Sequence, residues 1–183
     1  VSSQTGGGHR SAAKALEESL HRLHLKMPSR GMAKGKAFSV KVAHRILEES
    51  HWMTRAFAGV YNHMLRHHQD KMKHYYQWIE SLNLHNQPLI IQSSLRYGQQ
   101  LVEKFRPDAV VSVHPMMQYL FSKILRRLNW ADKVPLLTVL TDPGKQTWQG
   151  WACPDVERYY VPNMMARDYL LAQGITSERI EIA

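Results

Sequence analysis

A run of glycines followed by a histidine opens the chain and suggests a ligand-binding loop. Gly6, Gly7 and Gly8 directly precede His9, and apolar residues recur at helical spacing from there on. Adjacent glycines let backbone N–H groups approach a ligand closely, and the positive end of the following helix favours a phosphate or developing negative charge. The spacing differs from the Walker A and GxGxxG patterns. The run is therefore either an anion-facing loop or a flexible tight turn beside an exposed histidine.

Two more polar clusters follow short apolar runs that predict buried strands. His114 and Pro115 come after residues 109–113 (AVVSV), and Asp142 comes after residues 135–140 (PLLTVL). His114 can act as a base, bind a ligand hydroxyl, or hydrogen bond to a loop carbonyl. Asp142 can orient a histidine, bind sugar hydroxyls, or begin a turn. Ligands collect at the carboxyl ends of parallel strands, so we predict that the glycine loop, His114 and Asp142 share one edge of a sheet.

Aromatic residues mark two further segments. Trp148 and Trp151 lie in a segment with no regular pattern, where a tryptophan can stack on a sugar, shield a lid or simply pack. Residues 51–82 combine helical spacing with aromatic and basic side chains, as in a helix that lies on an anionic bilayer. The alternative is that the apolar stripe packs on the sheet. The expected membrane-facing residues are Trp52, Arg55, Arg66, Lys71 and Lys73.

Histidines also cluster within that segment. His63 and His67 are four residues apart, but no carboxylate accompanies them as in a HExxH motif. We therefore expect no metal site.

The predicted elements indicate an α/β fold. Helices are expected over residues 9–27, 45–82 with a break near 68–71, 88–105, 115–128 and 163–173, and strands over 37–43, 109–113, 135–140, 158–161 and 179–183. Alternation of strands and helices predicts a Rossmann-like, mostly parallel sheet with helices on both faces. Almost nothing precedes the glycine loop, so we expect the first strand to be largely missing. We expect residues 1–183 to form a single domain.

The amino-acid composition limits the kinds of partner and the location that we expect for the protein. Lys and Arg number 24 against 15 Asp and Glu, a net charge of +9, which favours an anionic partner. A single cysteine, Cys153, excludes an intramolecular disulfide, and no apolar run is long enough to cross a bilayer. No signal peptide is recognisable. We expect a cytosolic protein that associates peripherally with the cytoplasmic face of a membrane. We expect no nucleic-acid partner, because only the net charge points to one.

Three segments in order resemble the monogalactosyldiacylglycerol synthase family and the related bacterial diacylglycerol glucosyltransferases. They are residues 3–12 (SQTGGGHRSA), residues 107–115 (PDAVVSVHP), and residues 138–142 (TVLTD) followed by 147–148 (TW) and 158–162 (RYYVP). The order and approximate spacing agree over essentially the whole chain. The loop after Asp142 departs from the family pattern, which has His-Pro pairs before and after Thr147-Trp148.

The resemblance implies the N-terminal half of a GT-B glycosyltransferase. In this family the N-terminal domain binds diacylglycerol and the membrane, while the C-terminal domain, which is absent from this sequence, binds most of the UDP-sugar. A hexosyl group is transferred with inversion, without a cofactor or bound metal. By resemblance His9 is the general base, and Gly6, Gly7 and Gly8 lie near the donor phosphates. The expected contacts to acceptor or sugar are His114, Pro115, Asp142 and Trp148.

Two alternatives remain open from the sequence. One is a transferase that acts on an undecaprenyl-linked acceptor, because such enzymes also have a glycine-rich loop with a histidine. The other is a stand-alone membrane-binding or nucleic-acid-binding module without catalysis, which the altered loop after Asp142 favours.

Overall fold

The core of the protein is a four-stranded parallel sheet. The computed structural model describes residues 7–26, 39–43, 46, 52–71, 74, 77, 88–142 and 149–183. Its strands are β1 (Val110–Ser112), β2 (Leu136–Val139), β3 (Arg158–Val161) and β4 (Ile180–Ile182), and they follow one another in the order β1-β2-β3-β4. Every neighbouring pair is parallel, so the carboxyl ends of all four strands lie at one edge.

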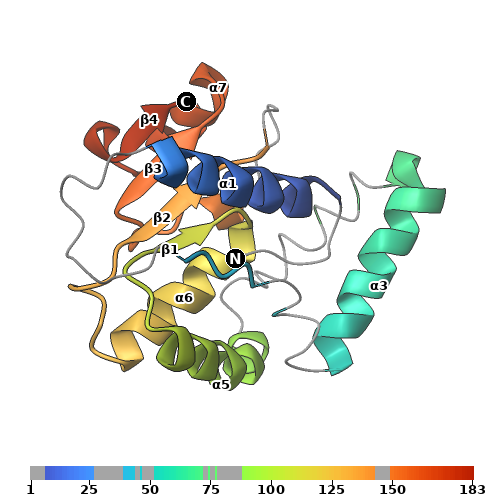
Figure 1. Cartoon of the computed structure of the whole chain (residues 1–183). Coiled ribbons are helices and arrows are strands. Elements are labelled where there is room, and N and C mark those ends of the chain that lie inside the picture. The colour runs from blue at the N-terminus through green and yellow to red at the C-terminus, as the bar shows by residue number, and fades with distance from the viewer. Residues whose placement is uncertain are drawn as a thin grey trace.

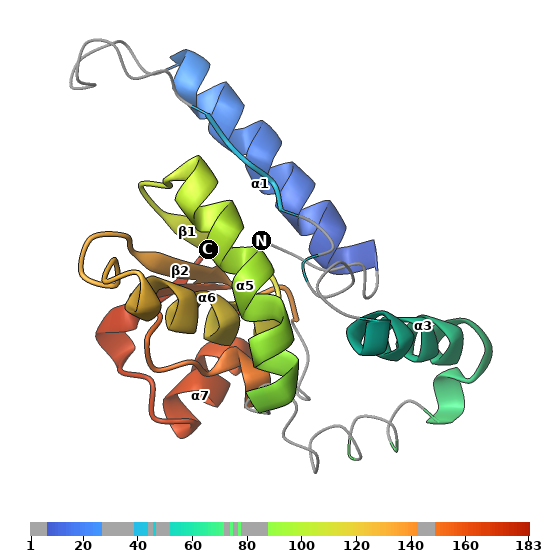
Figure 2. The same cartoon turned by 90° about the horizontal axis from the view of Figure 1, so that it is seen from below.

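Helices cover both faces of this sheet, which confirms the predicted α/β, Rossmann-like class. Helix α1 (Gly7–Lys26) lies on one side, and α6 (Pro115–Arg127) and α7 (Met164–Ala172) lie on the other (Figure 2). Helix α5 (Pro88–Phe105) packs against α6. Helix α3 (Trp52–His67) and the following 3-10 turn η1 (Gln69–Lys71) stand apart from the sheet in both views (Figure 1). The predicted helix break near residues 68–71 is confirmed.

Local sequence signals account for the ends of the helices. The side chain of Asn163 accepts a hydrogen bond from the backbone N–H of Ala166 and caps α7, as predicted. Gly174, with φ 85°, follows the end of α7 in a left-handed conformation that suits glycine. Pro115 occupies the first turn of α6, where a missing N–H costs nothing.

One expected strand is wrong. Residues 39–43 belong to no strand, although residues 37–43 alternate in polarity. Alternation describes which side chains face a core, whereas a strand also requires a partner for its backbone. The side chain of Ala43 is buried in the core nevertheless. The predicted absence of a first strand concerns residues 1–6, which lie outside the described part of the chain.

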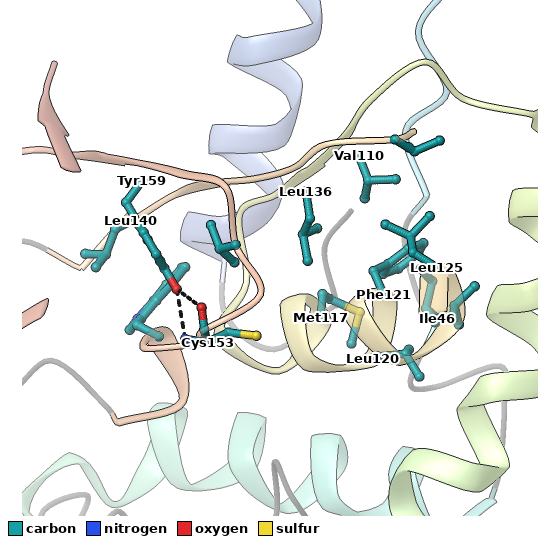
Figure 3. Close-up of a cluster of buried hydrophobic side chains, with 14 of the residues drawn as sticks. Ile46, Val110, Met117, Leu120, Phe121, Leu125, Leu136, Leu140, Cys153 and Tyr159 are labelled. Carbon is teal, nitrogen blue, oxygen red and sulfur yellow. Dashed lines mark hydrogen bonds between the residues drawn. The ribbon is translucent and has the colours of Figure 1, made fainter. Parts of the chain in front are cut away.

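Buried apolar side chains of the strands and of α6 form a cluster (Figure 3). Among them is Tyr159 of β3, whose side chain is fully buried. Its hydroxyl accepts a hydrogen bond from the backbone N–H of Cys153 at 2.8 Å and donates one to the carbonyl of Cys153 at 2.6 Å (Figure 3). Burial raises the pKa of Tyr159 far above its ordinary value. The phenol therefore acts as a neutral clamp on the segment that precedes β3.

Replacing this hydroxyl tests the clamp. Tyr159→Phe is expected to lower the free energy of unfolding by about 1 to 3 kcal/mol, because the backbone groups of Cys153 lose a buried partner. Urea denaturation measures the change. Tyr160→Phe is the matched control, since Tyr160 is the next residue of β3 and its side chain is only half-buried. Equal losses in the two variants would show that the buried hydroxyl has no special role.

Candidate functional site

The site lies where the start of α1 meets the carboxyl ends of β1 and β2. His9 is the third residue of α1, and its Nδ1 lies 2.9 Å from Oγ1 of Thr141, which follows β2. The imidazole of His9 meets that of His114 edge to face, with ring centroids 4.7 Å apart. His114 follows β1. Three segments far apart in sequence therefore bring their polar side chains together, as the strand-end argument predicts.

His114 is held in one tautomer by the start of α6. Its side chain is buried, and its Nδ1 accepts a hydrogen bond from the backbone N–H of Met116 at 3.2 Å, so it caps the helix. A neutral imidazole that accepts at Nδ1 carries its hydrogen on Nε2. Burial lowers the pKa of His114 well below 6.5, and the neighbouring His9 lowers it further. At neutral pH His114 is thus an uncharged hydrogen-bond donor through Nε2.

Asp142 is oriented by a buried tryptophan. The indole N–H of Trp151 donates to Oδ2 of Asp142 at 2.7 Å. The Trp151 side chain is fully buried, and its rings lie 6.0 Å from the imidazole of His9, centroid to centroid. Of the three alternatives for Trp151, the structure shows the packed one. The indole instead fixes the carboxylate that follows β2.

Opposing effects set the protonation of His9. Burial is the largest of them and lowers the pKa of His9 below 6.5. The negative charge of Asp142 and a hydrogen bond to the backbone of Val113 oppose this effect and raise the pKa of His9. The net result is an imidazole that is neutral at pH 7 and still has a carboxylate nearby to stabilise its protonated form. These are the properties required of a general base.

Helix α6 holds the segment that carries Trp151. The segment begins with the 3-10 turn η3 (Gln149–Trp151) and leads into β3. From α6, the Gln118 amide donates to the carbonyl of Gly150 at 2.6 Å, and the Tyr119 hydroxyl donates to the carbonyl of Ala152 at 2.6 Å. One turn and two turns further on, Ser122 and Arg126 donate hydrogen bonds to Asp155. One face of a single helix therefore determines where Trp151 and, through it, Asp142 lie.

The glycine loop opens α1, as the sequence predicts. Gly7 is the first residue of the helix and Gly8 the second. A Cβ added to Gly8 would meet no described atom within 4 Å, so the space beside it is open. The first turn of α1 contains no acidic residue, which leaves the positive end of the helix available to an anion. Gly6 lies outside the described residues.

The remaining predicted site residues lie in different places. Pro115 is buried in the first turn of α6, where it helps to begin that helix. Trp148 lies outside the described residues. Arg55 and Arg66 are exposed on α3, and Lys71 is exposed on η1. Trp52 is the first residue of α3, but its side chain is not described, and Lys73 lies outside the described part of the chain.

Two residues were missed as members of the site. In the sequence Thr141 is only the residue before Asp142, and Trp151 is equally compatible with packing, sugar stacking or shielding a lid. The position of Thr141 directly before Asp142 was the signal for the first. No sequence signal indicated that the Trp151 indole hydrogen bonds to Asp142, nine residues earlier.

Two other features of the described residues lie outside this site. No group of three His, Cys, Asp or Glu side chains in the described segments could hold a metal ion. A cavity of about 430 Å³ opens at the opposite edge of the sheet, near the start of β2, and its lining includes Arg126, Asp132 and Asp155. Chemistry at His9 therefore does not involve that cavity.

Comparison with known proteins links nearly the whole chain to one family. The family model described as monogalactosyldiacylglycerol (MGDG) synthase matches residues 9–183. A probable monogalactosyldiacylglycerol synthase 2, chloroplastic, from Oryza sativa subsp. indica is 27% identical over 98% of this chain and 36% of its own length. The chloroplastic synthase of Spinacia oleracea is 26% identical over 98% of this chain and 33% of its own. The chain thus spans about a third of the length of these relatives.

The buried histidines make stability depend on pH. The pKa values of His9 and His114 are lowered in the folded state, so the unfolded chain binds more protons below its ordinary histidine pKa of 6.5. The stabilisation is complete above about pH 6.5 and is lost as the pH falls toward the folded-state pKa values. Urea midpoints between pH 7.5 and 5 are expected to fall accordingly.

Replacing one histidine measures its contribution to the pH dependence of stability. His9→Gln should reduce the loss of stability between pH 7.5 and 5, because one of the two depressed groups no longer titrates. His67→Gln, which replaces an exposed histidine of α3, should leave the loss unchanged. The assignment fails if His9→Gln steepens the pH dependence or matches the His67 control.

Proposed function

The chain belongs to the MGDG synthase family, and we propose on this basis that it is the acceptor-binding domain of a lipid glycosyltransferase. The proposed reaction moves a hexosyl group, galactose or glucose, from a UDP-sugar to the free hydroxyl of diacylglycerol with inversion. His9 is the proposed general base. The relatives are named as monogalactosyldiacylglycerol synthases, and their names indicate both the sugar and the lipid.

The observation that carries this proposal is the position of His9. Its imidazole lies at the start of α1, against Thr141 and His114, at the edge of the sheet where ligands collect. The pKa of His9 is lowered, so the ring is neutral and able to accept a proton at pH 7. Gly8, one residue before His9, is exposed, and a Cβ added to it would meet no described atom within 4 Å.

The chemistry follows from these groups. An alcohol is a weak nucleophile until a base within hydrogen-bond reach takes its proton. The acceptor oxygen forms a bond to the anomeric carbon while the bond from that carbon to UDP breaks, and the electron pair leaves with the diphosphate. The acceptor proton passes to His9, and Asp142 stabilises the imidazolium. Backbone N–H groups in the first turn of α1 can stabilise the diphosphate without a metal ion.

The donor half of the reaction is proposed to lie in another domain. The chain covers about a third of the length of its relatives, and its described residues contain one sheet. We therefore propose that residues 1–183 form the acceptor domain of a two-domain enzyme, with the UDP-sugar bound mainly by the second domain. Alone, this domain is expected to show no transfer.

Membrane contact is proposed to occur through α3 and η1. Helix α3 stands apart from the sheet and exposes Arg55 and Arg66, and η1 exposes Lys71 (Figure 1). No helix among the described residues is long and apolar enough to cross a bilayer. A basic helix that lies on an anionic surface would bring a lipid alcohol to the site without spanning the membrane. The same surface favours the second candidate, a lipid-binding module without catalysis.

Removing the base tests the transferase. In the full-length protein that carries this chain, His9→Ala is expected to lower kcat for transfer from UDP-galactose or UDP-glucose to diacylglycerol in mixed micelles by about 10²- to 10⁴-fold. His67→Ala replaces an exposed histidine on α3 and should retain the rate. Near-normal turnover of the His9 variant would remove this residue as the base. An inactive wild-type protein that binds vesicles would favour the lipid-binding module.

Charge reversal tests the membrane surface. Arg55→Glu, Arg66→Glu and Lys71→Glu combined are expected to weaken binding of the chain to phosphatidylglycerol vesicles by roughly 100-fold or more, since each basic residue near an anionic surface contributes about 1 kcal/mol. Co-sedimentation measures the affinity. The control combines Arg127→Glu, Lys133→Glu and Arg158→Glu. These changes alter the net charge equally but lie at the end of α6 and near the starts of β2 and β3, outside α3 and η1. Equal losses would indicate that binding depends only on net charge.

A further inference from the structure

The structure indicates which nitrogen of His9 does the chemistry. We infer that Thr141 is a positioning residue: its Oγ1 accepts a hydrogen bond from Nδ1–H of His9 and so leaves Nε2 as the basic nitrogen. The inference deepens the proposed function, because it assigns a tautomer to the residue proposed as the base. It rests on one contact between residues 132 positions apart, with Nδ1 and Oγ1 separated by 2.9 Å.

Thr141 is firmly placed for this role. It lies two residues after the end of β2, and the residue before it, Leu140, is buried and donates its backbone N–H to the carbonyl of Tyr160 at 2.8 Å. The hydroxyl therefore comes from the end of a paired strand rather than from a free loop. His9 also hydrogen bonds to the backbone of Val113. With Nδ1–H as the donor to its acceptors, Nε2 is left to receive a proton from a substrate alcohol.

The direction of the hydrogen bond follows from the proposed role of His9 as the base. A threonine hydroxyl can donate or accept. If it donated to Nδ1, the neutral ring would carry its hydrogen on Nε2 and would have no free lone pair for a substrate. Once His9 has taken a proton, both ring nitrogens carry hydrogen, and Oγ1 must accept. A hydroxyl that accepts throughout needs no rearrangement while the proton moves.

The neighbouring histidine provides a contrast. Nδ1 of His114 accepts from the backbone N–H of Met116, so neutral His114 carries its hydrogen on Nε2. The inferred tautomer of His9 is the opposite one. Two imidazoles with ring centroids 4.7 Å apart thus offer different groups: a basic nitrogen on His9 and an N–H donor on His114. This difference would allow His9 rather than His114 to act as the base.

The tautomer can be read directly by nitrogen NMR. With ¹⁵N-labelled histidine in the chain, His9 is assigned by the resonances missing in His9→Gln, and spectra are recorded above its pKa. The expected wild-type result is a protonated Nδ1 and an unprotonated Nε2. A neutral His9 with its hydrogen on Nε2 overturns the inference, whether or not any variant folds.

Two substitutions test the role of the hydroxyl. Thr141→Val has nearly the same shape but no hydroxyl, and it is expected to give a mixture of tautomers and to lower kcat of the full-length protein by about 10- to 100-fold. Thr141→Ser keeps the hydroxyl and should keep the Nδ1–H tautomer and most of the rate. A valine variant that retains the wild-type tautomer, or a serine variant that loses it, contradicts the inference.

The two proposals can fail separately. The NMR measurement needs no transferase activity, so an inactive protein with Nδ1 protonated in the wild type and altered by Thr141→Val would support the tautomer assignment and count against the proposed reaction. Loss of transfer in His9→Ala, together with Nε2 protonated in the wild type, would support the reaction and overturn the role of Thr141.

Discussion

The geometry of the site depends on a buried amide in α6. Gln118 is fully buried, accepts a hydrogen bond from the Thr138 hydroxyl at 2.7 Å and donates one to the carbonyl of Gly150 at 2.6 Å. It therefore ties the central strand β2 to the segment that begins with η3. Buried polar groups of this kind are costly unless every partner is in place, so they select one arrangement of the chain. Gln118 fixes Gly150, and Trp151 is the next residue in the chain. The indole of Trp151 is therefore placed to donate its hydrogen bond to Asp142.

Electrostatics at the site follow from this packing. Two imidazoles, one buried and one partly buried, lie side by side, and burial lowers the pKa of both. Only His9 has a carboxylate that offsets burial, because Trp151 holds Asp142 at the end of β2. Nδ1 of His114 accepts a hydrogen bond from the backbone N–H of Met116 at the start of α6. The fold thus gives adjacent histidines different proton affinities and different tautomers, which is a common way to divide acid and base roles.

The same arrangement is consistent with membership of the MGDG synthase family. The family match covers residues 9–183 and includes each of the strand ends that carry the site. Described contacts connect His9, His114, Thr141 and Asp142 through Trp151 and α6, and none of them involves the cavity at the opposite edge. Helix α3 stands apart from the sheet, and its basic residues Arg55 and Arg66 are exposed.

The sequence by itself determined the class of fold, most of the elements and the edge at which the site forms. Short β-branched runs and capping residues such as Asn163 are local signals, and the carboxyl ends of parallel strands meet by geometry alone. The strand expected at residues 37–43 failed because alternation does not supply a backbone partner. Tertiary structure alone decided that Trp151 faces Asp142 and that Thr141 engages Nδ1 of His9. Those contacts join residues whose separation depends on how α6 packs on the sheet, and side-chain hydrogen bonds of this kind leave no periodic trace in the chain.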